Sequence, residues 1–569
     1  MGLNTALQVG KSGLLASQTA VQVAGSNLAN MATRGYHRQT VELSPSRNQE
    51  LQNGVFVGRG VELTSITRQI DEALETRLRS AIADQSRSSI SQDLLGQIEA
   101  IENEFSDVDL STRLAAFFNS WSNLATNPQD DSLRALVVEE AQTLASFIQD
   151  LDGEYGRLTK QTDDAIGNAA STVNDLLSRI EGLNTRIAVQ EGGQGGSGGL
   201  RDQRDSLLSE LSQYLDISTV EQRNGKVDVF VGSTPIILDG KNRGVEIKTT
   251  SENGESQVQV VVGADKTPLD VSSGEIGAMI QFRYGDLADT RANLDRLASQ
   301  IIWQTNRVHS QSQGETGFDS VTGAAKVADA TAALSDADAT GLDFTAGHGS
   351  FEVHLTQKST GQRVSQTIRV DLDGINPGTD TTLSSLAADL DAVDNLNASV
   401  TADGRLQLDA ATDDFEVSFS DDSSGVLAAL GVNTFFTGGD SYDIGVNNVV
   451  SRDVSKLAAA RGHVPGDNAA ARAVSDLKDQ SLTELDGLSI TGFWNRHVES
   501  NAIALAQARE QVQADATVRS TLDEQQQAVS GVNADEETIN LLQYQRGYQA
   551  SARFITVVDE LMQTLLSLV

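Results

Sequence analysis

The residue types that could perform chemistry are sparse in this chain. It has six histidines, and no two of them have the i, i+4 spacing that places zinc ligands on one face of a helix. They are His37, His309, His348, His354, His463 and His497. The absence of cysteine excludes disulfides, thiolate nucleophiles and thiolate metal sites. We therefore predict that the histidines lie on the surface or in loops and bind no metal.

A glycine-rich run and an acidic stretch resemble ligand sites only by composition. Residues 193–198 match the dinucleotide-binding pattern, and residues 195–199 match the pattern around a hydrolase nucleophile. Both sites need a preceding strand, whereas this run follows a helical segment and has the composition of a flexible turn. The carboxylates between residues 409 and 422 lack the spacing of a calcium-binding EF-hand loop. The sequence therefore predicts no catalytic, cofactor or metal site, which favours a structural role over an enzyme.

Composition also argues against two classes of partner. Asp and Glu together number 79 and Lys and Arg 42, so the formal net charge is −37. A surface of this charge repels nucleic acid and anionic membranes. No segment approaches the roughly 18 apolar residues of a membrane-spanning helix. We expect neither partner, and since no cleavable signal peptide is visible, export from the cytoplasm would use another route.

The first predicted element is a helix at the C-terminal end of the chain. From Asn533 to Val569 apolar residues recur in steps of three and four, which predicts one face of a helix that seeks a partner. Asn533 is expected to cap this helix, with Glu536 reaching back in a capping box. The main apolar positions are Leu541, Tyr544, Tyr548, Ile555, Val558, Met562 and Leu565.

In the first 28 residues, apolar residues also recur in steps of three and four. Small residues at Gly10, Ser17 and Ala24 would let another helix approach closely. The pattern leaves two interpretations open, a pair of helices at the chain ends or ordinary core helices of one globular domain. The apolar positions are Leu3, Leu7, Leu14, Val21 and Leu28.

The predicted fold class is mainly α with β-rich inserts. Residues 1–68 with 528–569 would form a discontinuous, coiled-coil-like terminal helical domain. A helical bundle domain would combine residues 69–215, 275–339 and 446–527 from both halves of the chain. Alternating apolar residues predict a small β-rich insert at 216–274 and an outer β-rich domain at 340–445. Within the bundle we expect separate helices near 133–151 and 173–189, and one helix from about 275 to 309.

Residues 26–36 closely resemble the N-terminal signature of bacterial flagellar rod, hook and hook-associated proteins. That signature usually reads N-N-[LI]-A-N-x-N-T-x-G-Y, and Asn27, Asn30, Gly35 and Tyr36 match it. Ser26 and Ala32 replace two of its asparagines. Residues 541–550 are similar to the C-terminal signature of the same axial family. Residues 202–205, 435–447, 466–469 and 530–537 narrow the resemblance to the hook-associated protein 1 family.

The resemblance implies a structural subunit that is secreted unfolded through the flagellar type III apparatus, with an export chaperone on its C-terminal region. It also implies a ring of copies at the hook–filament junction, between the hook protein and another hook-associated protein. The terminal helices would form the inner tube of this assembly. The expected assembly residues are Leu3, Leu7, Leu14, Val21, Asn27, Leu28, Asn30, Gly35, Tyr36, Leu541, Tyr544, Tyr548, Ile555, Val558, Met562 and Leu565.

Three alternatives stay open from the sequence. Flagellin or hook-associated protein 3 would share the helical ends but usually lacks the Asn27–Tyr36 signature. A hook or rod protein would share the signature but would lack the long helical region at 69–215. A secreted enzyme or adhesin with helical arms would need a ligand or metal in its β-rich inserts.

Overall fold

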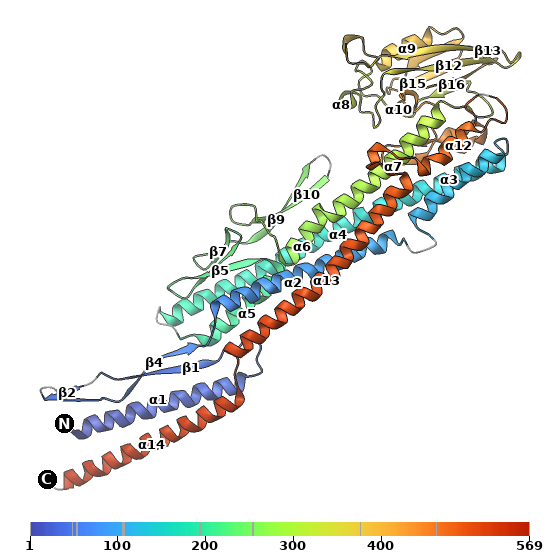
Figure 1. The fold of residues 1–569 in the computed structure, drawn as a ribbon. Coiled ribbons are helices and arrows are strands. Elements are labelled where there is room, and N and C mark those ends of the chain that lie inside the picture. Colours follow the sequence, from blue (N-terminus) through green and yellow to red (C-terminus); the bar gives the residue numbers. More distant parts are fainter. Residues whose placement is uncertain are drawn as a thin grey trace. The chain divides into compact units, whose positions relative to one another are not determined.

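Figure 1 shows the computed structural model of the chain. It describes residues 2–47, 49–52, 55–104, 108–192, 196–252, 255–375, 377–462 and 464–567. Val569, His463 and residues 193–195, on which predictions were made above, lie outside these ranges. The chain forms two compact units. Unit 1 contains residues 1–94, 161–282 and 506–569, and unit 2 contains residues 95–160 and 283–505.

Three long helices contribute residues to both units. They are α2 (Glu72–Glu102), α4 (Asp131–Glu191) and α13 (Ile490–Ser530). Helix α4 corrects the prediction of separate helices near 133–151 and 173–189, because one helix of 61 residues spans both. It contains no proline, and its glycines cost only about 1 kcal/mol each relative to alanine. The buried face continues through Tyr155 and Ile166, so burial offsets that cost.

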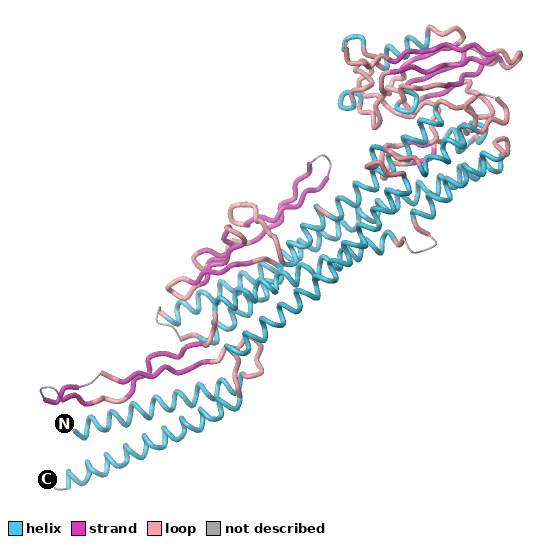
Figure 2. The backbone as a smooth tube through the Cα atoms, viewed as in Figure 1, coloured by secondary structure: helices cyan, strands magenta, loops and turns pink. Residues whose placement is uncertain are grey.

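The chain ends in unit 1 form an antiparallel helix pair beside short strands (Figures 1 and 2). The helices are α1 (Gly2–Asn30) and α14 (Ala534–Ser567). Strand β1 (Gln39–Pro45) pairs with β4 (Val61–Arg68), and β2 (Gln49–Gln52) pairs with β3 (Val55–Val57). The prediction of a wholly helical terminal domain is therefore wrong for these four strands. The β-branched Val41, Val61 and Ile66 favour extended backbone in this segment.

The remainder of unit 1 combines helices with two small antiparallel sheets. The helices wholly or mostly within it are α5 (Gly198–Tyr214) and α6 (Gly274–Tyr284). Helix α2 packs against α13 through an apolar cluster of Leu74, Leu78, Ala81, Ile82 and Leu522. The strands of the sheets are β5 (Ile217–Glu221), β6 (Val227–Val231), β7 (Thr234–Leu238), β8 (Lys241–Asn242), β9 (Val245–Glu252) and β10 (Glu255–Val262).

The predicted helix from 275 to 309 is interrupted. Helix α6 ends at Tyr284, and α7 (Asp286–Ser310) begins after Gly285. Gly285 has φ −107° and ψ −98°, outside the helical region, so the backbone turns there.

The helical part of unit 2 surrounds an aromatic cluster. Helix α3 (Leu110–Thr126) supplies Phe117 and Trp121, and the chain before β17 (Phe436–Thr437) supplies Phe435. The Phe435 ring centroid lies 5.3 Å from that of Trp121 and 6.3 Å from that of Phe117. The other short elements of this part are β18 (Gly445–Val446), α11 (Asn448–Arg452), η2 (Val454–Lys456), α12 (Ala469–Asp476), η3 (Leu477–Asp479) and η4 (Thr483–Leu485).

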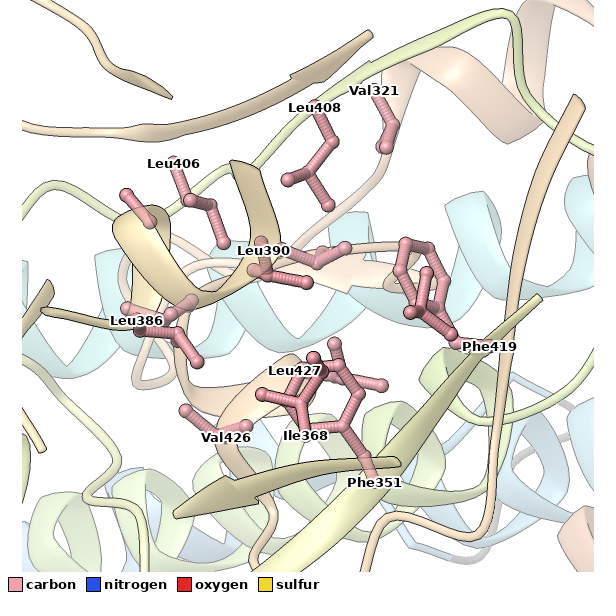
Figure 3. Packing of buried hydrophobic residues seen from close by; sticks show 14 of the residues in the cluster. Val321, Phe351, Ile368, Leu386, Leu390, Leu406, Leu408, Phe419, Val426 and Leu427 are labelled. Carbon is pink, nitrogen blue, oxygen red and sulfur yellow. The ribbon is translucent and has the colours of Figure 1, made fainter. Parts of the chain in front are cut away.

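A β-rich module in unit 2 has its own apolar core (Figure 3). One sheet has the order β13-β12-β16 and the other the order β11-β15-β14, and all pairings are antiparallel. The strands are β11 (Ser320–Thr322), β12 (Gly349–Gln357), β13 (Arg363–Val370), β14 (Leu396–Val400), β15 (Leu406–Ala410) and β16 (Phe415–Ser420). The helices are α8 (Ala337–Thr340), η1 (Pro377–Thr379), α9 (Leu383–Asp391) and α10 (Val426–Ala429).

The core of this module extends from Phe318 to Val432. Phe351, Phe419 and Leu427 converge on it from β12, β16 and α10 (Figure 3). The chain before residue 340 therefore contributes to the core, whereas Phe435 packs against α3 instead. Across the described parts of both units, no helix has the length and apolar character needed to cross a membrane.

Candidate functional site

The two chain ends meet at one buried amide. Asn27, near the end of α1, is 1 % exposed, and its Nδ2 donates to the Gln39 carbonyl at 2.9 Å and to Glu537 Oε2 at 3.1 Å. Its Oδ1 accepts from the Gln39 backbone N–H at 3.0 Å and from the Tyr36 hydroxyl at 2.8 Å. Both donors and both lone-pair positions of the amide are therefore used. This side chain fixes the end of α1, the start of β1 and the start of α14 relative to one another.

A basic residue reinforces this connection. Arg38 Nη2 lies 2.7 Å from Glu537 Oε1, and its Nη1 lies 3.0 Å from Glu536 Oε2. The Arg38 backbone N–H also donates to the Ser530 carbonyl at 2.9 Å. Asn533 caps α14 as predicted, since its Oδ1 accepts from the Asp535 backbone N–H at 3.0 Å. The predicted capping box is not formed, because Glu536 pairs with Arg38 instead.

Small residues make the contact between α1 and α14. A Cβ added at Gly10 would lie 2.7 Å from Ile555, and one at Gly13 would lie 2.9 Å from Ser551 Oγ. On the opposite helix, a Cβ at Gly547 would lie 3.0 Å from Ser17 Oγ. The backbones can approach closely only because these positions lack side chains, a general use of glycine at crossing helices. The small residues therefore define the contact line more than the leucines do.

The predicted residues of α1 and the following loop occupy different environments. Gly35 is exposed and has φ +77°, a left-handed conformation that favours glycine. Asn30 is half-buried and donates only within its own helix, to the Ser26 carbonyl. Tyr36 joins Asn27, as described above. The half-buried apolar positions are Leu3, Leu7, Leu14, Val21 and Leu28.

The predicted residues of α14 divide between a covered and an open side. Val558 is buried within the single chain, at 3 % exposure. Leu541, Tyr544, Ile555 and Met562 are half-buried, whereas Tyr548 and Leu565 are exposed. A second apolar row lies beside the covered face, and we call it the open flank. It consists of Ile539, Phe554, Val557, Leu561 and Leu565, which are 44–64 % exposed.

A buried ionic cluster anchors the segment that follows Tyr36. His37 Nδ1 lies 2.8 Å from Asp202 Oδ1, and its Nε2 lies 3.4 Å from Glu75 Oε1. Burial lowers the pKa of His37, but the hydrogen bonds to Asp202 and Glu75 outweigh burial and raise it to about 9. His37 is therefore a cation at neutral pH. Gln526 also donates to Glu75 Oε1 at 2.7 Å, so the cluster ties β1 to α2, α5 and α13 within unit 1.

Three members of this cluster have the geometry of metal ligands. His37, Asp202 and Asp205 place ligand atoms within 4.8 Å of one another. Arg68 Nη1, however, lies 2.8 Å from Asp202 Oδ1 and 2.6 Å from Asp205 Oδ2. Its guanidinium and the protonated His37 together already neutralise the two carboxylates, and a protonated His37 cannot donate a lone pair to a metal. The residues therefore fit an internal ion-pair network better than a metal centre.

The prediction that the histidines lie on the surface or in loops is wrong for His309, His354 and His497, which are buried in α7, β12 and α13, whereas His37 lies in a loop but is buried there. Burial lowers the pKa of His309 to about 4, and its Nδ1–H donates to the Asn433 carbonyl at 2.8 Å while Nε2 accepts from the Ala458 N–H at 2.9 Å. The spacing of the histidines in the sequence could not predict that they are buried, because their hydrogen-bond partners, such as Asn433 and Ala458 for His309, lie far away in the chain. The same holds for Arg38 and Glu537.

Models of known protein families match three parts of this chain. Residues 95–323 match the model of the flagellar hook-associated protein FlgK helical domain. Residues 525–568 match that of the flagellar basal body rod FlgEFG protein C-terminal region, and residues 7–37 match that of the flagella basal body rod protein. The two rod-type matches cover most of the helix pair described above, and the helical-domain match covers parts of both units.

Full-length relatives agree with these models. Flagellar hook-associated protein 1 of Escherichia coli strain K12 is 26 % identical over 582 residues, covering 98 % of each chain. The protein of that name from Bacillus subtilis strain 168 is 24 % identical and covers 100 % of this chain and 98 % of its own. A solved structure of the flagellar hook junction protein FlgK from Burkholderia pseudomallei is 17 % identical, covers 80 % of this chain and 100 % of its own, and has a TM-score of 0.49. The family models and the full-length relatives agree with one another, and the chain is similar to flagellar hook-associated protein 1 over nearly its whole length.

Proposed function

We propose that this chain is a structural subunit of the bacterial flagellum that forms the junction between hook and filament, with no catalytic role. Similarity to known proteins supports the flagellar and structural role, because relatives named flagellar hook-associated protein 1 match this chain over nearly its whole length and theirs. The proposal extends to filament assembly and hence to motility. It locates the exported protein outside the cell, in the flagellum.

The open flank of α14 is the observation that carries the proposal. Helix α14 uses one face against α1, where Val558 and Ile555 lie and where the Phe554 ring also reaches Gly10, and leaves Val557, Leu561 and the outer part of Phe554 on the neighbouring side. Full burial of such a side chain is worth about 1.5–3 kcal/mol, so covering these half-exposed ones would add about 1 kcal/mol each. A contiguous apolar surface of this kind marks an interaction site.

We assign this surface to contacts between copies in a ring, with the helix pairs forming an inner tube. Leu565 belongs to this surface, whereas the exposed Tyr548 lies about 140° round α14 from Leu561. The hook protein would contact the ring on one side and another hook-associated protein on the other. Before assembly the open flank would favour aggregation, so an export chaperone covering the C-terminal region would protect it.

A charge introduced on the open flank tests this function. Leu561→Asp should leave the monomer folded, because Leu561 is 53 % exposed, but should place a carboxylate in an apolar contact in the assembly. Gln549→Asp is the matched control, since Gln549 is exposed and lies about 120° round the helix from Leu561. We expect few hooks with filaments for Leu561→Asp and normal numbers for the control, counted by electron microscopy. Normal assembly of Leu561→Asp with an unchanged monomer would contradict the assignment of the open flank.

A further inference from the structure

A groove of about 820 Å³ lies in unit 1 between the loop after α1 and the helices α4 and α5. We call it the arginine groove, because Arg34, Arg179 and Arg186 line it and all three are exposed. Arg179 and Arg186 are seven residues apart on α4 and therefore share one helix face. Within the described ranges none of the three forms an ion pair, whereas the nearby Arg38 and Arg68 are both paired with carboxylates.

The carboxylates of the groove do not cancel this charge. Asp202 lines it, but its Oδ1 lies 2.8 Å from Arg68 Nη1 and 2.8 Å from His37 Nδ1. These two cations of the same chain already offset the negative charge of Asp202. Glu210 is the other acidic residue of the lining. Three arginines against one uncompensated carboxylate leave the groove cationic. Exposed Ser206 provides a hydroxyl for further hydrogen bonds.

This groove is cationic in a chain whose net charge is −37. A long polyanion would be repelled by the rest of the surface, whereas a short acidic segment would meet only the groove. The chain itself can supply such a segment, since it has 79 Asp and Glu residues. Copies held together by the open flank would already be neighbours, so a second contact would form at high effective concentration.

We propose that the arginine groove binds a carboxylate-rich segment of a neighbouring copy of this chain. Arg34, Arg179 and Arg186 would each donate to a carboxylate, and a planar guanidinium suits bidentate pairing. The contact offsets part of the repulsion between copies and fixes their register through charge. The inference rests on the proposed assembly of copies, but its residues are separate from the open flank.

Crosslinking in isolated flagella tests this contact directly. Because the natural chain has no cysteine, Arg186→Cys creates a single attachment site for a photoreactive maleimide. Arg223→Cys is the matched control, since Arg223 is exposed and does not line the groove. We expect light to join Arg186→Cys to an acidic peptide of a second copy and Arg223→Cys to give no such product. No crosslink at Arg186→Cys, or a crosslink to another protein or to a segment without carboxylates, would overturn the proposal.

Charge reversal provides a second measurement that separates the two proposals. Arg179→Glu with Arg186→Glu should weaken self-association of the purified chain about tenfold relative to the natural sequence at low salt. The ratio of the two dissociation constants should fall toward one as salt screens the contact. Equal constants at all salt concentrations would overturn the groove contact while leaving the open flank intact. If the chain were absent from isolated flagella, both the groove contact and the proposed function would be contradicted.

Discussion

Asn27 and Glu537 lie 510 positions apart in the sequence, and a hydrogen bond of 3.1 Å joins their side chains in a buried position. The bond closes the helix pair at the end where α1 finishes and α14 begins. Asn27 belongs to the N-terminal family signature, and Glu537 lies in the first turn of α14. The two terminal helices are thus fixed to one another inside a single chain.

Asn27→Ala should loosen the helix pair. The change leaves the Tyr36 hydroxyl, the Gln39 backbone groups and Glu537 without their buried partner, at a cost of about 2–3 kcal/mol. Hydrogen exchange at α1 and α14 amides should accelerate about 30-fold or more. Asn30→Ala is the control, because Asn30 bonds only to neighbours in sequence. Equal exchange rates in the two variants would argue against the connecting role of Asn27.

Two glycines of α1 should respond in opposite directions to the same substitution. Gly25 has no atom within 4 Å of an added Cβ, so Gly25→Ala should stabilise the helix by about 1 kcal/mol. Gly10→Ala would meet Ile555 at 2.7 Å and Phe554 at 3.0 Å, which costs about 1–3 kcal/mol of overpacking. Hydrogen exchange in α1 should slow in the first variant and accelerate in the second. A stabilised Gly10→Ala would show that the helices do not pack as closely as described.

The sequence revealed the faces of these helices but not their partners. Periodicity identifies the apolar stripe of α14, since burial of a helix face needs nothing beyond spacing of three and four. The small residues Gly10 and Ser17 were expected to let another helix approach, and both lie on the contact with α14, but the pattern did not show that Gly13 also sets the contact line. Nor could it pair Arg38 with Glu537, since a polar contact between distant segments leaves no local pattern.

Long-range contacts also explain the errors in secondary structure and burial. Residues 39–45 and 61–68 become strands because β1 pairs with β4, a choice that tertiary contact decides. His37 is buried because Asp202 and Glu75 compensate its charge, and these two residues come from other helices. The Val227–Val231 strand was predictable because alternation is a local property.

Stability of unit 1 should fall at alkaline pH through His37. Its pKa is raised from 6.5 to about 9 in the folded chain, so the folded state holds a proton that the unfolded state releases earlier. The stabilisation is complete below pH 6.5 and is lost as the pH rises toward 9, with a total of at most about 3 kcal/mol. His37→Gln should be less stable than the natural chain at pH 6 and nearly equal to it at pH 9.5 in urea unfolding. A constant difference at both pH values would rule out a charged His37.

Removal of the β-rich module should leave the helices folded if the deleted residues are those that span its apolar core. Asn433 Nδ2 donates to the Ser312 carbonyl at 2.8 Å, so the two ends of the module lie close together. Deleting residues 318–432 with a short Gly-Ser linker should preserve the helical circular dichroism per remaining residue. Deleting 340–445 instead should lower the melting temperature strongly, because it removes Phe435 and Phe436 from their contacts with Phe117. Equal melting of the two deletions would contradict this division of the chain.

Val558 and Leu561 separate packing within the chain from packing between chains. Val558 is 3 % exposed, so Val558→Asp would bury a carboxylate within unit 1 and should cost several kcal/mol even in the monomer. Leu561 is 53 % exposed, so Leu561→Asp should leave hydrogen exchange of the monomer helices unchanged and act only on assembly. The measurement is exchange at α1 and α14 amides in both purified variants, followed by filament counts in cells. If hydrogen exchange at the α1 and α14 amides stays as slow in Val558→Asp as in the natural chain, the helix pair does not cover Val558. The residues of the covered face and of the open flank would then be different ones.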